Sequence, residues 1–519
     1  MKRLATSVIV GLATLGAAAA PAARPRLVVG IVVDQLRTDY IEYLNSCFSE
    51  RGFRLLMQNG AYLRDVDFNT SGLDAASATG LIYTGAYPSQ TGVPSAIVYD
   101  SDNPLSAPRP ALAEVKGASI TNDSFTPALL RLSTLSDELA ADGDGTSTIY
   151  SVSADPQQAV IMAGHAGNAA LWINNTSGNW ATTSYYGSLL QQAQQRNMRA
   201  SLASRIDTMT WRPSATCPAD PGRKPAFRHT FPRADRDVYK RFAASPLANA
   251  EVTDMAIEIL RDMPKTATQG GMNMLNLGYT VAPYKYSAKP GAREELTDSY
   301  LKLDGQLARL FDAIDRYVGR GNALIFLSST GYYDEAVTED KRLRIPGGEF
   351  SVKRARSLLN SYLTARHGNA AFVTAIRDGQ VYFDRKAIED RGLRPEAVID
   401  DACAFLHKMS GVADVIALDE VLKGGQDEDT RLRNRLDPRH CGDLTIRFAP
   451  GWTVVDDEAY PPQSKPVRES AVMTPAFIMG PGVNARTIDS PVDATTLSPT
   501  VAGILRIRSP NGARSRAAF

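Results

Sequence analysis

Apolar residues gather in short uninterrupted runs along this chain, and the first run ends on a carboxylate. Residues 27–33 are apolar and rich in β-branched side chains, and Asp34 follows directly. Such a run predicts a strand that is buried on both faces of a sheet. Because the ends of such strands face the ligand crevice in open α/β sheets, Asp34 is a candidate ligand for a metal or a substrate. Further strands are predicted at residues 147–152, 160–163, 323–328 and 474–479.

Helical spacing of apolar residues alternates with these runs. The clearest case is residues 294–318, where Leu296, Leu303, Leu307 and Ile314 belong to one stripe that predicts a core-facing side. Other helices are predicted at residues 39–58, 249–263 and 499–505. Alternating strands and helices are typical of an α/β protein, here a three-layer sandwich with a mixed or mostly parallel sheet.

Two regions interrupt this alternation. Residues 205–233 are rich in proline and polar side chains and are interpreted as a long excursion. Residues 345–441 contain two helical patterns, at 352–365 and 398–408, around the strand-like "GQVYFD", and are interpreted as an inserted subdomain. The core is therefore expected in two parts, residues 24–344 and residues 442–519.

The N-terminus predicts export. Lys2 and Arg3 precede an apolar stretch and an alanine run, the pattern of a cleaved signal peptide over residues 1–23. No later stretch is long and apolar enough to span a membrane. With 57 Lys and Arg against 56 Asp and Glu, the charge gives no reason to expect nucleic acid as a partner. We expect a periplasmic or otherwise exported protein, in which one or two disulfides could form among Cys47, Cys217, Cys403 and Cys441.

Several segments occur in the order and spacing of a known family. They include "LVVGIVVDQLRTDY", "IYTGAYPSQTGV", "AGHAGNAALWINNTSGNWATTSYY", "DSYLKLDGQLARLFDAID", "GDLTIRFAPGW" and "TPAFIMGPGV". Together they resemble the periplasmic alkaline phosphatases of the phosphate-irrepressible type, in the phosphodiesterase and nucleotide pyrophosphatase branch of the alkaline phosphatase superfamily. The resemblance covers nearly the whole mature chain and implies an alkaline phosphatase-type fold with an inserted subdomain.

The resemblance also implies a site with two zinc ions, which this chain does not reproduce. In active members two metals hold the attacking and leaving oxygens, a Thr attacks phosphorus, and an Asn and a Lys-x-Arg pair hold the phosphoryl oxygens. Asp34 matches the first zinc-binding Asp, but Ala75 stands at the nucleophile position. The Asn position falls among Pro94, Ser95 and Ala96, and the Lys-x-Arg position reads Asp155, Pro156 and Gln157. The remaining metal-ligand positions read Pro283, Ser287, Ser329 and Thr330, and the stretch "QSKPVRESAVM", just before "TPAFIMG", contains no His.

Four features leave alternatives open. Asp34 is either a weak metal ligand or a remnant bonded to nearby groups, and Ser77 and Thr79 are either a displaced nucleophile or helix-capping residues. A relocated zinc site could be built from Cys403, His407, His440 and Cys441, or these could be ordinary residues of a helical subdomain. The segment that replaces the metal loop carries Tyr279, Tyr284 and Tyr286, which either fill the vacated space or form a surface for a partner.

Two hypotheses follow from these substitutions. The first is an exported pseudoenzyme that has lost the two-zinc site and the nucleophile, binds no cofactor, and serves as a binding or assembly component with an envelope protein partner. The second is a phosphate-ester hydrolase, acting on monoesters or diesters, with a relocated or reduced metal site. Fold alone does not separate them, because function resides in the site.

Overall fold

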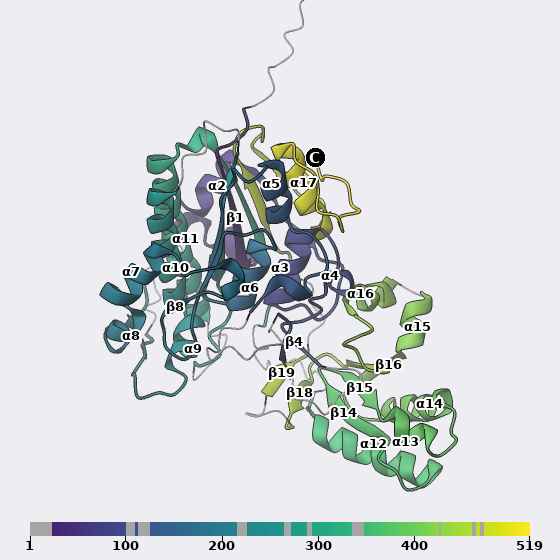
Figure 1. Ribbon diagram of the computed structural model, residues 1–519. Coiled ribbons are helices and arrows are strands. Elements are labelled where there is room, and N and C mark those ends of the chain that lie inside the picture. The colour runs from purple at the N-terminus through teal and green to yellow at the C-terminus, as the bar shows by residue number, and fades with distance from the viewer. Residues whose placement is uncertain are drawn as a thin grey trace, which may run out of the picture.

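The computed structural model shows an α/β core with a smaller subdomain attached at one end (Figure 1). The structure describes residues 23–99, 109–112, 125–214, 226–263, 271–287, 293–334, 347–424, 427–458, 463–467 and 472–519. Residues 1–22 of the predicted signal peptide, and Cys217, lie outside the described residues. No helix among the described residues is long and apolar enough to cross a membrane.

A nine-stranded mixed sheet forms the middle layer of the core, with β1 (Leu27–Asp34) at its centre. β1 runs parallel to both of its neighbours, β11 (Asn273–Thr280) and β12 (Ala323–Ser329). The order from edge to edge is β21-β2-β20-β12-β1-β11-β6-β7-β8. The other strands are β21 (Arg486–Ile488), β2 (Ala61–Leu63), β20 (Ala476–Met479), β6 (Ile149–Ser153), β7 (Ala169–Ile173) and β8 (Trp180–Ala181).

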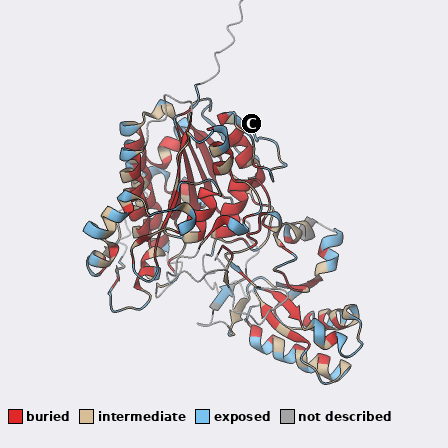
Figure 2. Ribbon diagram, viewed as in Figure 1, coloured by how far each residue is buried: buried red, intermediate tan, exposed pale blue. Residues whose placement is uncertain are grey.

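Alternate side chains of β1 enter two different hydrophobic clusters, which explains its continuous apolar run. Val29 and Ile31 pack with α2, α10 and α11, whereas Val28 and Val32 pack with α3, α5 and α17 on the opposite face. Figure 2 shows this buried centre between the two helical layers. The helices are α2 (Phe53–Asn59), α10 (Pro246–Asp262), α11 (Arg293–Tyr317), α3 (Ala75–Thr84), α5 (Leu135–Asp142) and α17 (Leu497–Leu505). The predicted three-layer α/β fold is confirmed.

Two predicted elements are wrong in type or length. Residues 160–163, predicted as a strand, belong to helix α6 (Pro156–Ala163), which begins after the N-cap Asp155. The helix predicted over residues 39–58 is divided into α1 (Thr38–Tyr43), a short 3-10 turn and α2. The second part begins after Gly52, which is buried against Asp304, so that an added Cβ would collide with the Asp304 side chain.

The inserted subdomain has its own sheets and core. Its four-stranded sheet has the order β14-β15-β17-β16, and a second sheet has the order β13-β18-β19. The strands are β13 (Glu349–Ser351), β14 (Val373–Arg377), β15 (Gln380–Phe383), β16 (Val412–Ala417), β17 (Leu444–Phe448), β18 (Thr453–Asp456) and β19 (Gln463–Pro466). The helices are α12 (Val352–His367), α13 (Arg385–Glu389), α14 (Pro395–Leu406), α15 (Leu418–Lys423) and α16 (Asp427–Arg435). Since β17 pairs with β15 and β16, the subdomain continues past the predicted boundary at residue 441.

Small paired strands and short helices complete the core. The pairs are β4 (Ile97–Val98) with β5 (Arg109–Pro110), β3 (Val66–Asp67) with β22 (Val492–Asp493), and β9 (Thr210–Trp211) with β10 (His229–Thr230). The helices are α4 (Pro88–Thr91), α7 (Gln191–Ala200), α8 (Leu202–Arg205) and α9 (Val238–Ala243). Cys47 is disulfide-bonded, whereas Cys403 and Cys441 are free. At least one of the disulfides that the sequence left open is therefore present.

Candidate functional site

Asp34 lies at the carboxyl end of β1 and is bonded to hydroxyl groups. Thr330 donates a hydrogen bond to Asp34 Oδ1 over 3.0 Å, and Thr330 in turn accepts one from the backbone N–H of Gln35 over 2.9 Å. Burial raises the pKa of Asp34 to about 7, although hydrogen bonds from Tyr332 and Thr330 act against this increase. Asp34 as a whole residue is half-buried. Tyr332 was not identified from the sequence, because nothing in the pattern around it marks a contact with a distant strand end.

The hydroxyl groups at the former ligand positions have protein partners of their own. Ser329 is fully buried and donates to the Leu36 carbonyl over 2.7 Å. Ser287 donates to Glu295 Oε1 over 2.8 Å, and Pro283 has no side-chain donor atom for a metal. Three of the positions that the resemblance assigns to zinc ligands, Ser287, Ser329 and Thr330, thus donate hydrogen bonds within the protein.

Ala75, at the nucleophile position, is the first residue of α3. The N-cap is Asp74, whose Oδ1 accepts from the Ser77 backbone N–H over 2.9 Å, and the Asp74 backbone N–H donates to the Ser77 hydroxyl over 3.1 Å. Thr79 donates to the Ala75 carbonyl over 2.6 Å. Ser77 therefore takes part in capping, as one alternative predicted, but Thr79 does not, and Asp74 was missed as the cap.

The residues at the former Lys-x-Arg position also have structural roles. Asp155 caps α6 by accepting from the Gln158 N–H over 2.9 Å. Gln157 is buried, donates to the Ala96 carbonyl over 2.9 Å and accepts from the Leu112 N–H over 3.3 Å. No side chain of this trio offers a positive charge to a bound anion.

Carboxylates surround the end of β1. Burial is the main cause that raises the pKa of Asp155, and the neighbouring Asp74 adds to it. The charges of Asp334 and Asp155 in turn raise the pKa of Asp34. Lys285 acts in the opposite sense on Asp155. The charged groups that raise the pKa of Asp34 and Asp155 are therefore carboxylates, and Lys285 is a cation that lowers the pKa of Asp155.

This donor set does not fit a pair of zinc ions. Zinc in proteins needs about four ligands from Cys, His or carboxylate side chains. Among the described residues, no group of three or more His, Cys, Asp or Glu side chains is arranged to hold a metal. Asp34 alone remains of the expected set, and its oxygen is bonded to Thr330.

The structure does not support a relocated metal site in the subdomain. Cys403 donates to the Val415 carbonyl over 3.4 Å, and His407 lies 3.4 Å from Asp414 Oδ1. His440 Nδ1 lies 3.0 Å from the backbone carbonyl oxygen of Tyr99, a residue of the core. Cys441 belongs to a different hydrophobic cluster from Cys403, so the four residues are not brought together.

The tyrosines of the former metal loop face inward. Tyr279 and Tyr284 are each 2% exposed, and the Tyr279 hydroxyl lies 3.0 Å from that of Thr253. Tyr284 packs against the rings of Trp211 and His229 with centroid distances of 5.3 and 4.8 Å. The prediction of a partner surface is wrong for these two residues, which fill space, while Tyr286 is half-buried.

Comparisons with known proteins define the class of this chain. Residues 28–472 match the type I phosphodiesterase / nucleotide pyrophosphatase family, and the chain belongs to that family. It is 27% identical over 521 residues to the alkaline phosphatase PafA of Elizabethkingia meningoseptica, across 94% of this chain and 93% of PafA. It is 24% identical over 517 residues to the alkaline phosphatase PhoV of Synechococcus elongatus, across 94% of this chain and 92% of PhoV.

A solved structure agrees with the sequence comparison. The crystal structure of wild-type alkaline phosphatase PafA superimposes with a TM-score of 0.79 at 25% identity, covering 96% of this chain and 98% of PafA. The predicted superfamily and the alkaline phosphatase-like fold are confirmed. The similarity extends over both the core and the subdomain.

Proposed function

We propose that this protein is an exported, non-hydrolytic member of the phosphodiesterase family, retained as a binding or assembly component of the cell envelope. The observation that supports this proposal most strongly is the pair of substitutions on two neighbouring helices. Ala75 begins α3 without a nucleophilic side chain, and Asp155 caps α6 where relatives of this kind need a cation.

Electrostatics support the same proposal. Phosphoryl transfer depends on positive charge placed where negative charge develops. Here the end of β1 carries Asp34, and Asp155 and Asp334 lie near enough to raise its pKa. A phosphate ester at this position would meet carboxylates and would gain no compensating cation from Gln157, whose amide is committed to backbone groups.

A second candidate function is a phosphate-ester hydrolase with a reduced metal site. The whole-chain similarity to alkaline phosphatases favours it, since relatives with that name align across 94% of this chain. On this alternative Asp34 would bind a metal through the acceptor positions of its carboxylate that the Thr330 hydroxyl does not occupy.

Metal analysis and a turnover assay on the same preparation test the proposal. We expect no stoichiometric zinc and no turnover of p-nitrophenyl phosphate or its diester, with or without added zinc. The matched control is Asp34→Asn, because phosphatase carried over from the expression host would be unaffected by this substitution. Activity that is present in the wild type and absent from Asp34→Asn would overturn the proposal and establish the hydrolase.

Export and partnership are tested separately. Mass spectrometry of the mature N-terminus is expected to show removal of about the first 23 residues, as a signal peptide requires. Cross-linking in the native envelope is expected to join the protein to an envelope protein. Recovery of an uncleaved chain from the cytoplasm would contradict the export prediction.

A further inference from the structure

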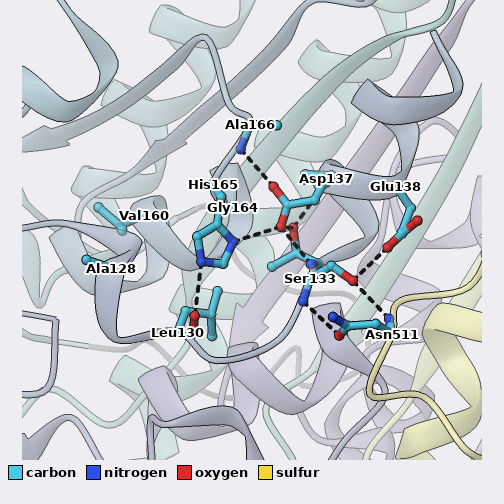
Figure 3. A network of polar contacts seen from close by, with 12 residues as sticks. Ala128, Leu130, Ser133, Asp137, Glu138, Val160, Gly164, His165, Ala166 and Asn511 are labelled. Carbon is cyan, nitrogen blue, oxygen red and sulfur yellow. Dashed lines mark hydrogen bonds and ion pairs between the residues drawn. The ribbon is translucent and has the colours of Figure 1, made fainter. Parts of the chain in front are cut away.

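His165 lies between two hydrogen-bond acceptors, one at each ring nitrogen. Nδ1 is 3.2 Å from Asp137 Oδ2, and Nε2 is 3.0 Å from the Leu130 carbonyl oxygen (Figure 3). A neutral imidazole has one N–H and can donate to only one of them, whereas an imidazolium donates to both. Both acceptors therefore receive a hydrogen bond only when the ring is protonated.

The surroundings of His165 fix the ring in this position. Asp137 belongs to the capping box of α5 and also accepts from the Ala166 N–H over 2.8 Å, so its carboxylate is held by several donors. Gly164, which precedes His165, has a φ of 69°, and a Cβ there would collide with Thr134 and Asp137. The close approach of this turn to α5 thus depends on glycine.

Charges around His165 favour the imidazolium. On α5 Asp137 is the bonded carboxylate, while Glu138 is turned away toward Ser133 and Arg508. The hydrogen bond to Asp137 is the main reason that the pKa of His165 lies above its usual value of 6.5. Burial alone would raise the pKa of Asp137, but the bonds from His165 and from backbone N–H groups bring it below its usual value.

The remaining contacts of this turn come from two tyrosines and one peptide carbonyl. Tyr185 donates to the His165 carbonyl over 3.1 Å, and Tyr186 donates to the Gly164 carbonyl over 2.7 Å. Besides Leu130, the Pro127 carbonyl also favours the charged ring. None of these groups places a positive charge against the imidazolium.

The segment bonded to His165 also joins the core to the inserted subdomain. In residues 126–131, the Thr126 N–H donates to the Leu112 carbonyl over 2.9 Å and the Arg131 N–H donates to the Thr91 carbonyl over 2.9 Å. The Arg131 guanidinium extends to Asp437 of the subdomain, with 2.5 Å between Nη2 and Oδ2. His165 therefore binds the segment that carries Arg131, the core residue of this ion pair.

We propose that His165 is a pH-dependent clasp between the core and the inserted subdomain. The imidazolium holds residues 126–131 against the end of α6. When the ring gives up one proton to solvent, Nδ1 keeps its N–H toward the carboxylate of Asp137, which is the stronger acceptor. Nε2 then presents a lone pair to the Leu130 carbonyl, so the bond to the segment is lost. The segment stays attached through its backbone bonds to Leu112 and Thr91 but is held less firmly, and the Arg131–Asp437 pair loses part of its support.

Hydrogen exchange measured by mass spectrometry tests this proposal on the full chain. After correction for intrinsic exchange, amides of residues 126–131 should exchange about tenfold faster at about pH 9 than at about pH 6, as expected for the loss of one charge-assisted bond. His165→Gln should exchange quickly at both pH values. His407→Gln, which replaces a histidine within the subdomain, is the matched control and should keep the wild-type pH dependence.

Two results would overturn the clasp. One is an equal corrected exchange of residues 126–131 at both pH values in the wild type, and the other is a pH dependence that persists in His165→Gln. If His165→Gln does not fold, NMR titration of the wild-type ring decides, because the clasp requires a midpoint above 6.5 that falls in Asp137→Asn. A midpoint at or below 6.5, or one unchanged in Asp137→Asn, would exclude the proposal.

Discussion

Asp34→Asn should stabilise the protein at neutral and alkaline pH, and the reason lies in the environment of the carboxyl group. The pKa of Asp34 is raised from 3.8 to about 7 by burial, so the folded protein favours the protonated form. The folded state then binds more protons than the unfolded state between these two values, and stability falls as the pH rises through this window. Below about pH 4 the carboxyl group is neutral in both states and this penalty is absent.

The size of the effect can be worked from the shift. About three pKa units at about 1.4 kcal/mol each give an upper limit of about 4 kcal/mol. The partial solvent exposure of Asp34 reduces this figure, and we expect about 1 to 3 kcal/mol. Asparagine keeps an oxygen that can accept from Thr330 and Tyr332, so most of the hydrogen bonding survives the change.

Urea unfolding of the wild type and of Asp34→Asn at a series of pH values between about 5 and 8 measures the effect. The stability difference between the two proteins should move in favour of the variant as the pH rises. Asp419→Asn, at an exposed position of α15, controls for the loss of one negative charge. The measurement is repeated with EDTA, because a metal bound to Asp34 would make the carboxylate stabilising. A difference that moves in favour of the wild type with rising pH would refute the reasoning.

Three further substitutions have expected outcomes that unfolding experiments can check. Arg131→Ala leaves Asp437 buried without its partner and should cost about 2 kcal/mol, measured as a lower urea midpoint; an unchanged midpoint would contradict the ion pair seen in the structure. Tyr284→Ala should cost about 3 kcal/mol and Tyr286→Ala about 1 kcal/mol, because only the first ring is fully buried; equal melting temperatures of the two variants would contradict this assignment. Gly164→Ala should cost at least about 2 kcal/mol through a positive φ and a collision with α5, and a variant as stable as the wild type would show that the turn can move away.

The layered fold could be predicted from the sequence because the long strands and helices have a clear pattern of apolar residues on their buried faces. The apolar run at residues 27–33 and the stripe on residues 294–318 correspond to β1 and to α11. The short run at residues 160–163 was assigned to the wrong class, since four apolar residues fit either a strand or one turn of helix. Asp155 and Pro156, an N-cap followed by proline, were the local signal for a helix.

The extent of the subdomain could not be read from local pattern. β17 has the composition of an ordinary strand, and nothing in its own residues indicates whether it joins the nine-stranded sheet or pairs with β15 and β16. Strand partnership is a property of the folded chain, so a boundary drawn between neighbouring motifs fell inside one sheet.

In the candidate site, too, residue types could be read from the sequence, whereas tertiary contacts could not. Residue type alone indicated that Ala75 cannot attack phosphorus, and this holds wherever the chain places it. Two contacts at the positions that the resemblance assigns to metal ligands join residues far apart in sequence, Thr330 to Asp34 and Ser329 to Leu36. These contacts became visible only with the fold.

Those contacts also show how polar groups at the end of β1 find partners within the protein itself. Buried polar groups are costly when they lack partners, so a site that merely lost its ligands would leave unpaired atoms at the end of the central strands. Ser329 and Thr330 instead donate to a carbonyl and a carboxylate, and Gln157 satisfies two backbone groups where an anion-binding side chain is expected. A single substitution back toward a metal ligand would remove one of these bonds without supplying the other ligands. On the proposed non-hydrolytic function, the site would therefore be separated from activity by several simultaneous changes.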